Sequence, residues 1–220
     1  MGSRTGSGLS SLASSTAEPD SRPVFVITGT SGEGKSTLAK GLVQRVPELE
    51  LAVSATTRPR RPGEEDGRDY WFLSEEEFDR KLAANEFLEW VRLPWGEGYR
   101  SGTLWSELDR IRAKGHSPLL EIETGGAIAV RDQDPTAVTI FVTAPSKEEL
   151  ERRLRSRATE GEGEIDERLE IAERQLALES EFSHTIVNDS VERALEELEG
   201  IVREALCAAG TMPARDPSPH

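Results

Sequence analysis

Several residue types are scarce in this sequence of 220 residues. It contains a single cysteine, Cys207, and three histidines that lie far apart. One cysteine excludes an intramolecular disulfide framework and a cysteine-rich zinc site, and it fits a reducing compartment. No apolar run approaches the ~20 residues of a membrane-spanning helix, and the N-terminal segment lacks the apolar core of a secretory signal. We therefore expect a cytoplasmic protein.

Positive charge is also scarce. The 41 Asp and Glu residues outnumber the 27 Lys and Arg residues, so the formal net charge is −14. A strongly acidic domain repels the phosphates of nucleic acids, which argues against a protein that coats DNA or RNA. We expect neither nucleic acid nor a membrane among its partners. The sequence carries no signal for an oligomeric state.

The two ends of the chain are poor in apolar residues. Residues 1–22 include seven serines and three glycines, and the last ten residues include three prolines. Segments of this composition bury too little apolar surface to offset the entropy lost on ordering. We expect a disordered tail over 1–22, one folded domain over 23–207 and a flexible tail over 208–220.

Between the tails, short apolar segments alternate with segments of helical periodicity. The strand patterns lie at 23–28, 51–55, 118–123, 137–143 and 184–188, and the helical ones at 35–46, 75–84, 103–113, 147–157, 165–182 and 190–206. Apolar strands without alternation are typical of strands buried on both faces. Strands separated by helices predict an α/β fold, a parallel sheet of about five strands with flanking helices. The rhythm breaks at 56–102, so we assign an inserted lobe over 54–103 and a core over 23–53 and 104–207.

A glycine-rich turn joins the first predicted strand to the first predicted helix. It has the pattern G-x-x-x-x-G-K-[ST] and consists of Gly29, Thr30, Ser31, Gly32, Glu33, Gly34, Lys35, Ser36 and Thr37. Its glycines let backbone N–H groups turn toward phosphate oxygens, and the helix N-terminus adds partial positive charge. Lys35 can reach the β- and γ-phosphates and Ser36 can ligate Mg²⁺. The pattern predicts a nucleoside triphosphate site, and leaves a kinase, a switch and a motor open.

Arginines are concentrated in one segment of this acidic chain. Arg58, Arg60 and Arg61 fall within four residues, and Pro59 and Pro62 stiffen the backbone of this segment. Guanidinium groups suit bidentate phosphate contacts better than ammonium groups do. The segment indicates a second phosphate-binding site. A solvated basic loop is the plainer alternative.

Two later helical segments carry arginines on either side of an acidic, glycine-containing hairpin. Arg153 and Arg157 are four residues apart and share a helix face, and Arg168 lies in the next helical segment. Two such helices joined by a flexible hairpin suit a lid, which we place at about 155–168. Ordinary surface charges paired with glutamates would give the same pattern.

Taken in order, these segments resemble the guanylate kinase family of P-loop nucleoside monophosphate kinases. The resemblance covers residues 23–205 and rests on 29–37, 54–64, Asp69-Tyr70, Phe87-Leu88-Glu89-Trp90, 120–123 with Gly126, 150–159 with Arg168, and 186–189. It implies transfer of the γ-phosphoryl group of ATP to GMP, with Mg²⁺, giving ADP and GDP in purine nucleotide metabolism. Phosphoryl transfer needs positioning and charge neutralisation more than covalent chemistry.

The resemblance also implies roles for individual residues. For the acceptor GMP, it assigns the phosphate to Arg58, Arg61 and Tyr70, and the guanine to Ser54, Glu89, Thr103 and Glu123. For the donor side, it assigns the transferring group to Arg153, Arg157 and Arg168 together with Lys35, and the adenine of ATP to Asn188. Glu121, at the end of a predicted strand, is placed to orient the shell of a magnesium ion held by Ser36.

The chemistry of guanine supports the role of Glu89. Guanine presents an N1–H and an exocyclic amine, two parallel donors that one carboxylate can accept together, and adenine has no such pair. If Glu89 were buried against the wrong base, its unpaired charge would cost about 1–3 kcal/mol or more. The plainer interpretation of Glu89 is a solvated charge.

One segment departs from the family pattern. The segment 94–103 is about two residues longer than its counterpart in the family. Ser101 falls where the family carries a tyrosine that touches the acceptor phosphate. Arg100 is an added cation that could take over this contact. Two other functions therefore stay open: a kinase for another phosphorylated acceptor such as ribose 1,5-bisphosphate, and a non-catalytic guanylate-kinase-like binding module. The base-reading set argues against the first, and the intact Lys35 and Ser36 argue against the second.

Overall fold

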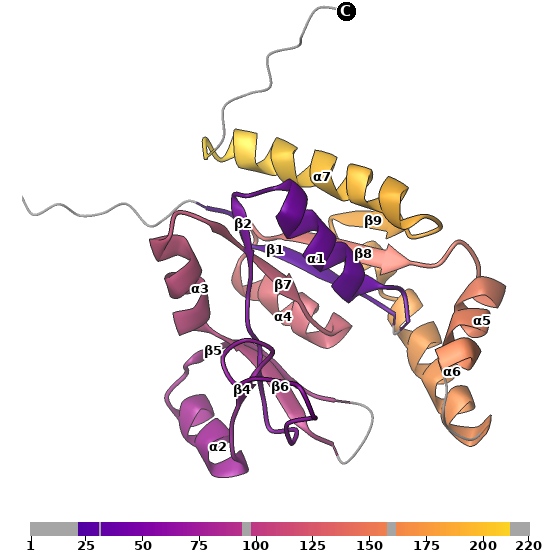
Figure 1. Ribbon diagram of the computed structural model, residues 1–220, viewed down its shortest axis with the longest axis horizontal. Coiled ribbons are helices and arrows are strands. Elements are labelled where there is room, and N and C mark those ends of the chain that lie inside the picture. Colours follow the sequence, from indigo (N-terminus) through magenta and orange to yellow (C-terminus); the bar gives the residue numbers. More distant parts are fainter. Residues whose placement is uncertain (1–21, 31, 94–97, 158–161, 212–220) are drawn as a thin grey trace, which may run out of the picture.

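The computed structural model describes residues 22–30, 32–93, 98–157 and 162–211. A five-stranded parallel sheet flanked by helices forms the larger part of the molecule, and a smaller four-stranded sheet forms a lobe below it (Figure 1). The fold class expected from the sequence, a parallel sheet of about five strands with flanking helices, is confirmed. Within the described residues, no helix combines the length and apolarity needed to cross a membrane.

The parallel sheet has the strand order β2-β7-β1-β8-β9. Its strands, in that order, are Leu49–Leu51, Ser117–Glu121, Phe25–Gly29, Val138–Thr143 and His184–Val187. Alternate residues of β1 enter two different cores. Phe25 and Ile27 belong to one, and Val26 belongs to the other together with Val24, which precedes the strand. The central strand is thus buried on both faces, which explains its continuous apolar sequence.

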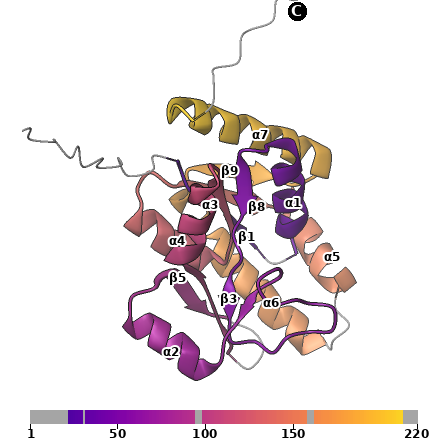
Figure 2. The same ribbon diagram turned by 60° about the vertical axis from the view of Figure 1, so that its left-hand side comes forward.

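Helices cover both faces of this sheet (Figures 1 and 2). On one face lie α1 (Lys35–Arg45) and α7 (Val191–Ala208), and on the other lie α3 (Trp105–Ala113) and α4 (Thr124–Gln133). At the edge where β8 ends, α5 (Lys147–Arg157) packs against α6 (Glu162–Leu176). A short 3₁₀ helix, Glu179–Glu181, then leads into β9.

The lobe is a sheet of strand order β4-β3-β6-β5 with one helix packed on it. These strands are Trp71–Phe72, Ala55–Thr56, Arg100–Leu104 and Phe87–Arg92, and the helix α2 is Glu75–Ala83. Ser74 and Glu77 form a reciprocal capping box that starts α2. Phe78 of α2 stacks on Phe87 of β5 with ring centroids 4.4 Å apart, so the lobe has a small core of its own.

The sequence-based boundaries differ from the structure in three places. The single strand expected at 51–55 is two strands, β2 in the core sheet and β3 in the lobe, because the chain crosses between the sheets there. The helix expected at 165–182 ends at Leu176, and α4 was not expected because two glycines in its first turn interrupt the apolar period. Apart from Arg22 and residues 208–211, the expected tails lie outside the described residues.

Candidate active site

The phosphate loop follows β1 at the carboxyl edge of the parallel sheet and leads into α1. Gly29 has a φ of 138°, and a Cβ there would overlap the backbone of Val142 on β8, so only glycine fits. The ammonium group of Lys35 donates to the carbonyl oxygens of Gly29 and Thr30, at 2.9 and 2.8 Å. Burial lowers the pKa of Lys35, and the carboxylates of Glu123, Glu121 and Glu33 oppose that shift. The loop therefore holds its lysine by its own backbone.

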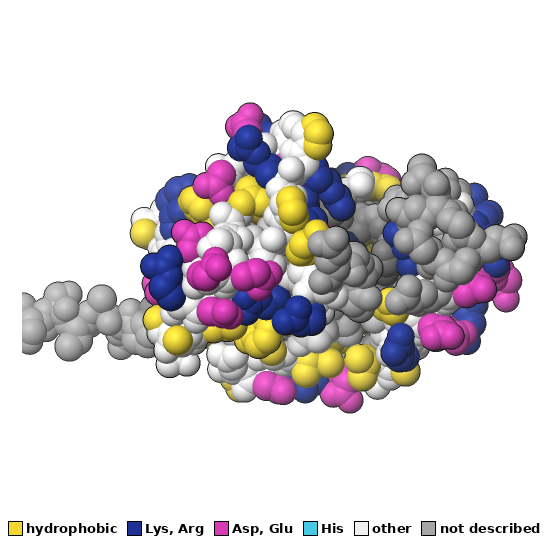
Figure 3. All heavy atoms as spheres, turned by 90° about the horizontal axis from the view of Figure 1, so that it is seen from below, with side chains coloured by type: hydrophobic (Ala, Val, Ile, Leu, Met, Phe, Trp, Pro, Cys, Tyr) yellow, Lys and Arg dark blue, Asp and Glu magenta, His cyan; other side chains and the backbone are white. Residues whose placement is uncertain are grey.

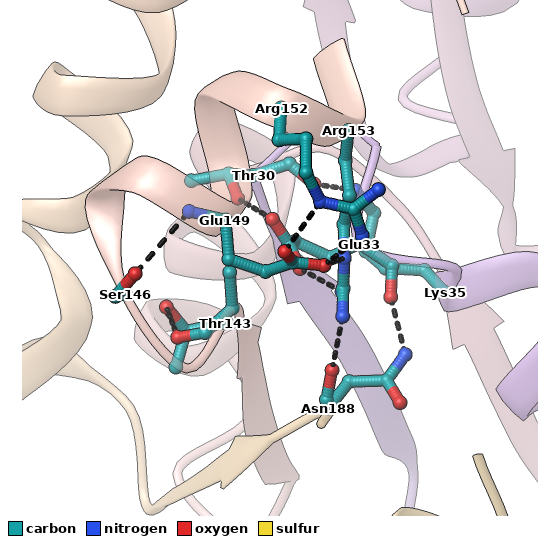
Figure 4. Close-up of polar contacts among 10 residues, drawn as sticks. Thr30, Glu33, Lys35, Thr143, Ser146, Glu149, Arg152, Arg153 and Asn188 are labelled. Atoms are coloured by element: carbon teal, nitrogen blue, oxygen red, sulfur yellow. Dashed lines mark hydrogen bonds and ion pairs between the residues drawn. The ribbon is translucent and has the colours of Figure 1, made fainter. Parts of the chain in front are cut away.

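A buried glutamate ties this loop to α5 (Figure 4). The side chain of Glu33 is fully buried, and Arg153 of α5 donates to its Oε2 at 2.9 Å. The same guanidinium donates to Glu149 Oε1 at 2.8 Å and to the carbonyl of Asn188 at 2.9 Å. Burial raises the pKa of Glu33, and Arg153, Thr30 and Lys35 act against that shift. The arginine expected at the transferring group thus sits against the phosphate loop.

Asn188 also holds the loop. Its side-chain amide donates to the carbonyl oxygen of Glu33 at 2.7 Å, and the residue is 5% exposed. A cavity of about 270 Å³ opens beside this contact. Its lining consists of Gly32, Glu33, Gly34, Thr37, Arg152, Arg153, Asn188, Asp189 and Val191. Asn188 and part of the phosphate loop therefore share one cavity.

A second cavity, of about 310 Å³, lies between the core and the lobe. Nine residues singled out from the sequence line it: Lys35, Ser36, Ser54, Arg58, Arg61, Tyr70, Glu89, Glu121 and Glu123. Sequence reasoning assigned no role to six other lining residues: Thr56, Glu64, Val91, Leu93, Ser101 and Ile122. The structure thus brings the end of the phosphate loop and the arginine segment to one space.

A glutamate and two aromatic rings hold Arg58, one of the two arginines of this cavity, in place. Arg58 donates to Glu64 Oε1 at 2.7 Å, and its guanidinium carbon lies 5.2 Å from the ring centroid of Tyr70 and 5.8 Å from that of Phe72. Glu64 Oε2 accepts the backbone N–H of Arg61 at 2.8 Å. These contacts, with that of Arg58 first, lower the pKa of Glu64. A Pro-Gly-Glu sequence after the arginines is the only local signal for this role of Glu64.

Two further carboxylates line the same cavity, one of them buried and the other half-buried. Glu89 of β5 is 3% exposed, and its Oε1 accepts the hydroxyl of Thr103 at 2.8 Å. Burial raises the pKa of Glu89 to about 7, although the hydrogen bonds from Thr103 oppose the rise. Burial also raises the pKa of Glu123, whose Oε2 accepts the amide of Gln175 at 3.1 Å. Each carboxylate can therefore accept further N–H donors.

The hydroxyl of Ser36 and the carboxylate of Glu121 meet beside the phosphate loop. Ser36 Oγ donates to Glu121 Oε1 at 2.6 Å. Hydroxyl and carboxylate oxygens are the donors that Mg²⁺ prefers, and this ion commonly uses few protein ligands beside water and phosphate oxygens. The two residues therefore fit a magnesium ion. Among the residues that the structure describes, no group of three or more His, Cys, Asp or Glu forms a metal site of its own.

Arg100 does not enter the cavity, so the suggestion that it replaces the missing tyrosine is wrong. It is 6% exposed, forms ion pairs with Glu75 and Asp79 of α2, and lies 4.4 Å above the ring of Phe78. Successive side chains of a strand point to opposite faces. Ser101 consequently lines the cavity while Arg100 faces α2.

The structure leaves some predicted residues apart or undescribed. Arg168 lies on α6, and the lining of neither cavity includes it. Arg157 ends α5, but its side chain lies outside the described part of the structure. Ser31, residues 94–97 and residues 158–161 of the expected lid also lie outside it.

Comparisons with known proteins agree on one family. A family model described as guanylate kinase matches residues 21–205. A guanylate kinase of Synechococcus sp. (strain JA-3-3Ab) is 47% identical over 179 residues, 81% of this chain and 81% of that one. The guanylate kinase of Rubrobacter xylanophilus is 47% identical over 180 residues, 82% and 93% of the two chains. A crystal structure of guanylate kinase from Anaplasma phagocytophilum, 29% identical, superposes with a TM-score of 0.66 over 83% of this chain and 85% of that one.

Proposed function

The chain belongs to the guanylate kinase family, and we propose how its two cavities divide the family's reaction, the ATP-dependent phosphorylation of GMP, between them. One observation carries the proposal. Lys35 and Ser36, at the end of the phosphate loop, line the same cavity of about 310 Å³ as the arginine and carboxylate groups of the lobe. A donor phosphate on the loop and an acceptor phosphate on the arginines would therefore face each other, as in-line transfer requires.

On the donor side, we assign ATP to the phosphate loop and the cavity beside it. The loop, residues 29–37, cradles the phosphates through its backbone N–H groups and the start of α1. Lys35 neutralises charge on the β- and γ-phosphates from its place over the loop. Asn188 and Asp189 line the cavity where the adenine would lie. Arg153, together with Arg157 and Arg168 of the lid at about 155–168, is assigned to the transferring group.

A magnesium ion belongs between these groups. When bound, it neutralises charge on the donor phosphates, which lowers the barrier to transfer. Ser36 would supply one oxygen ligand, and Glu121 would orient the surrounding waters. Both residues line the cavity that Lys35 also lines.

On the acceptor side, we assign GMP to the lobe at 54–103. Arg58 and Arg61 hold its phosphate with Tyr70, and Glu64 fixes Arg58 in position. Glu89 accepts the paired donors of guanine, and Ser54, Thr103 and Glu123 complete the base site. The buried, incompletely satisfied carboxylate of Glu89 supports this assignment, because it gains most from a ligand with two parallel N–H donors.

We also propose a cytoplasmic location and no nucleic-acid partner. The face drawn in Figure 3 has acidic and basic side chains interspersed, whereas a nucleic-acid site gathers basic ones. The net charge of −14 supports the same proposal.

Acceptor turnover tests the assignment directly. ADP formation from Mg·ATP would be followed with GMP, dGMP, AMP, CMP, UMP and ribose 1,5-bisphosphate offered separately. Strong turnover with GMP, alone or with dGMP, is the expected result. Turnover with another acceptor and none with GMP would mean that the lobe was assigned the wrong ligand. Silence with all six would favour a binding module.

A further inference from the structure

Gly126 occupies a place where a side chain would meet the carboxylate of Glu89. It is the third residue of α4 and it is buried. A Cβ built on Gly126 would overlap Glu89 Oε2 and lie 3.1 Å from Glu89 Cδ. The carboxylate therefore fills the space that the missing side chain leaves.

The backbone of Gly126 does not itself require glycine. It is absent from the glycines with positive φ, and it lies in the regular first turn of a helix. Glycine in a helix is less favourable than alanine by about 1 kcal/mol. This position suits glycine because the Glu89 carboxylate occupies the space of a side chain, and not because of the backbone conformation.

Two residues of β6 also lie close to Glu89. Thr103 pairs with Glu89 across the β5–β6 ladder and donates its hydroxyl to Oε1. A Cβ on the neighbouring Gly102 would overlap the carbonyl oxygen of Glu89 and lie 2.8 Å from Trp90 Cβ. The position of the carboxylate therefore depends on Thr103, which donates to Oε1, and on Gly126, which leaves room for Oε2.

We propose that Gly126 is a specificity-determining position, because its missing side chain lets the Glu89 carboxylate take the orientation that reads guanine. The inference rests on the proposed function in one respect, the role of Glu89 in guanine binding. A methyl group at position 126 would displace Oε2, the far end of a flexible side chain, so the fold can accommodate the change. The pair of hydrogen bonds to guanine would not survive this displacement, because both bonds depend on the orientation of one carboxylate.

The test compares Gly126→Ala with Gly125→Ala. Both substitutions add one methyl group to the first turn of α4 and raise its helix propensity equally. The methyl at 125 would lie 3.6 Å from Val91 Cγ1, an ordinary van der Waals contact. Displacement of a binding group by about 1 Å can change a rate by ~10²-fold. We expect Gly126→Ala to raise the KM for GMP about 10- to 100-fold with the KM for ATP unchanged, and Gly125→Ala to change neither by more than about twofold.

A shorter carboxylate makes the test independent of folding. Asp in place of Glu89 ends near the position of Cδ, 3.1 Å from a methyl at 126, so it reduces the overlap. The loss in kcat/KM for GMP in the double variant Glu89→Asp/Gly126→Ala should be smaller than the product of the two single losses. If Gly126→Ala alone does not fold, the double variant is compared with Glu89→Asp. A further tenfold loss there would overturn the proposal.

Glu89→Ala, assayed in parallel with GMP and AMP, separates the two hypotheses. Unchanged discrimination between GMP and AMP in Glu89→Ala would remove the premise, the role of Glu89. A loss of discrimination in Glu89→Ala combined with equal KM values for GMP in Gly126→Ala and Gly125→Ala would leave the function standing and overturn the role of Gly126.

Discussion

The proposed donor and acceptor halves of the site balance their charges in different ways. On the donor side, Lys35 is held by two carbonyl oxygens, and Arg153 by Glu33, Glu149 and Asn188. In the part of the acceptor side that we assign to guanine, Glu89 is buried and Glu123 is half-buried, and burial raises the pKa of both. The donor cations have acidic or carbonyl partners within the protein, whereas the acceptor carboxylates keep capacity for a ligand.

The phosphate end of the acceptor side resembles the donor side in this respect. Arg58 is paired with Glu64 as Arg153 is paired with Glu33. Each proposed phosphate site thus has an arginine oriented by a neighbouring glutamate. Under the proposed assignment, the contrast follows the chemistry of the ligand: the groups assigned to phosphate are oriented in advance, and the groups assigned to guanine are left short of donors. A site short of donors discriminates strongly, because a base without the matching N–H groups leaves the carboxylate unpaired.

Lys35→Ala should have the largest effect and should break the donor half alone. Removing one preorganised charge from a transferring group costs about 10²–10³-fold in kcat. The Kd for GMP should change little, because other groups bind the acceptor. Steady-state kinetics and GMP titration by calorimetry measure the two quantities, with exposed Lys40→Ala on α1 as the matched control. Full activity of Lys35→Ala would mean that the phosphate loop was wrongly assigned.

Glu89→Gln should stabilise the free protein at alkaline pH and weaken GMP use. Burial raises the pKa of Glu89 from 4.5 to about 7, so the folded state favours the protonated carboxyl group. The contribution of this group to the free energy of unfolding is fully present below about pH 4.5. It is lost as the pH rises through 7, a decrease of about 3 kcal/mol.

Urea unfolding at pH 5 and pH 8 measures this effect. Glu89→Gln should gain stability relative to the parent protein between the two pH values, by an amount of the order of 2–3 kcal/mol. In the parent protein, kcat/KM for GMP should fall below pH 7, because reading guanine needs the ionised carboxylate. An equal stability difference at both pH values would contradict the buried-carboxylate account.

Glu33→Gln and Glu64→Gln should show that the two arginine–glutamate pairs act on different substrates. Each substitution keeps the shape of the side chain and removes the charge that orients one arginine. We expect Glu33→Gln to raise the KM for ATP several-fold and Glu64→Gln to raise the KM for GMP several-fold. Bisubstrate kinetics on both variants give the four constants. Equal effects of either substitution on both substrates would show that the two halves do not act separately.

How far the sequence predicts this site depends on how local each feature is. Lys35 and Ser36 could be placed because the phosphate loop is contained within nine consecutive residues. The pair Glu33–Arg153 could not, because its members are 120 positions apart and the sequence assigns one to the phosphate loop and the other to a lid helix. The same holds for Gly126 and Glu89, which meet only when α4 packs against β5. Helix α4 itself was not expected, because its glycines resemble a loop, and one of them is needed for that contact.

Arg100 illustrates the remaining difficulty, and its substitution should have the smallest effect on catalysis. The segment around it lacks apolar alternation, so the sequence does not show that 100–104 is a strand or which face Arg100 takes. Lys in its place keeps the charge but loses the fork that reaches Glu75 and Asp79 and part of the contact with Phe78. Arg100→Lys should lower the free energy of unfolding by about 1–2 kcal/mol and leave the KM for GMP within about twofold.

Arg58→Lys is the matched comparison on the opposite face of the same lobe. Arg58 lines the cavity, so the loss of its planar fork should raise the KM for GMP, whereas Arg100→Lys should not. Thermal unfolding and GMP kinetics on the two variants measure both effects. If Arg100→Lys raised the KM for GMP as much as Arg58→Lys did, Arg100 would have to reach the acceptor phosphate during turnover. The face of β6 that we assign to GMP would then have to be the face of Arg100 and not that of Ser101. Both side chains cannot face the cavity while the strand stays regular.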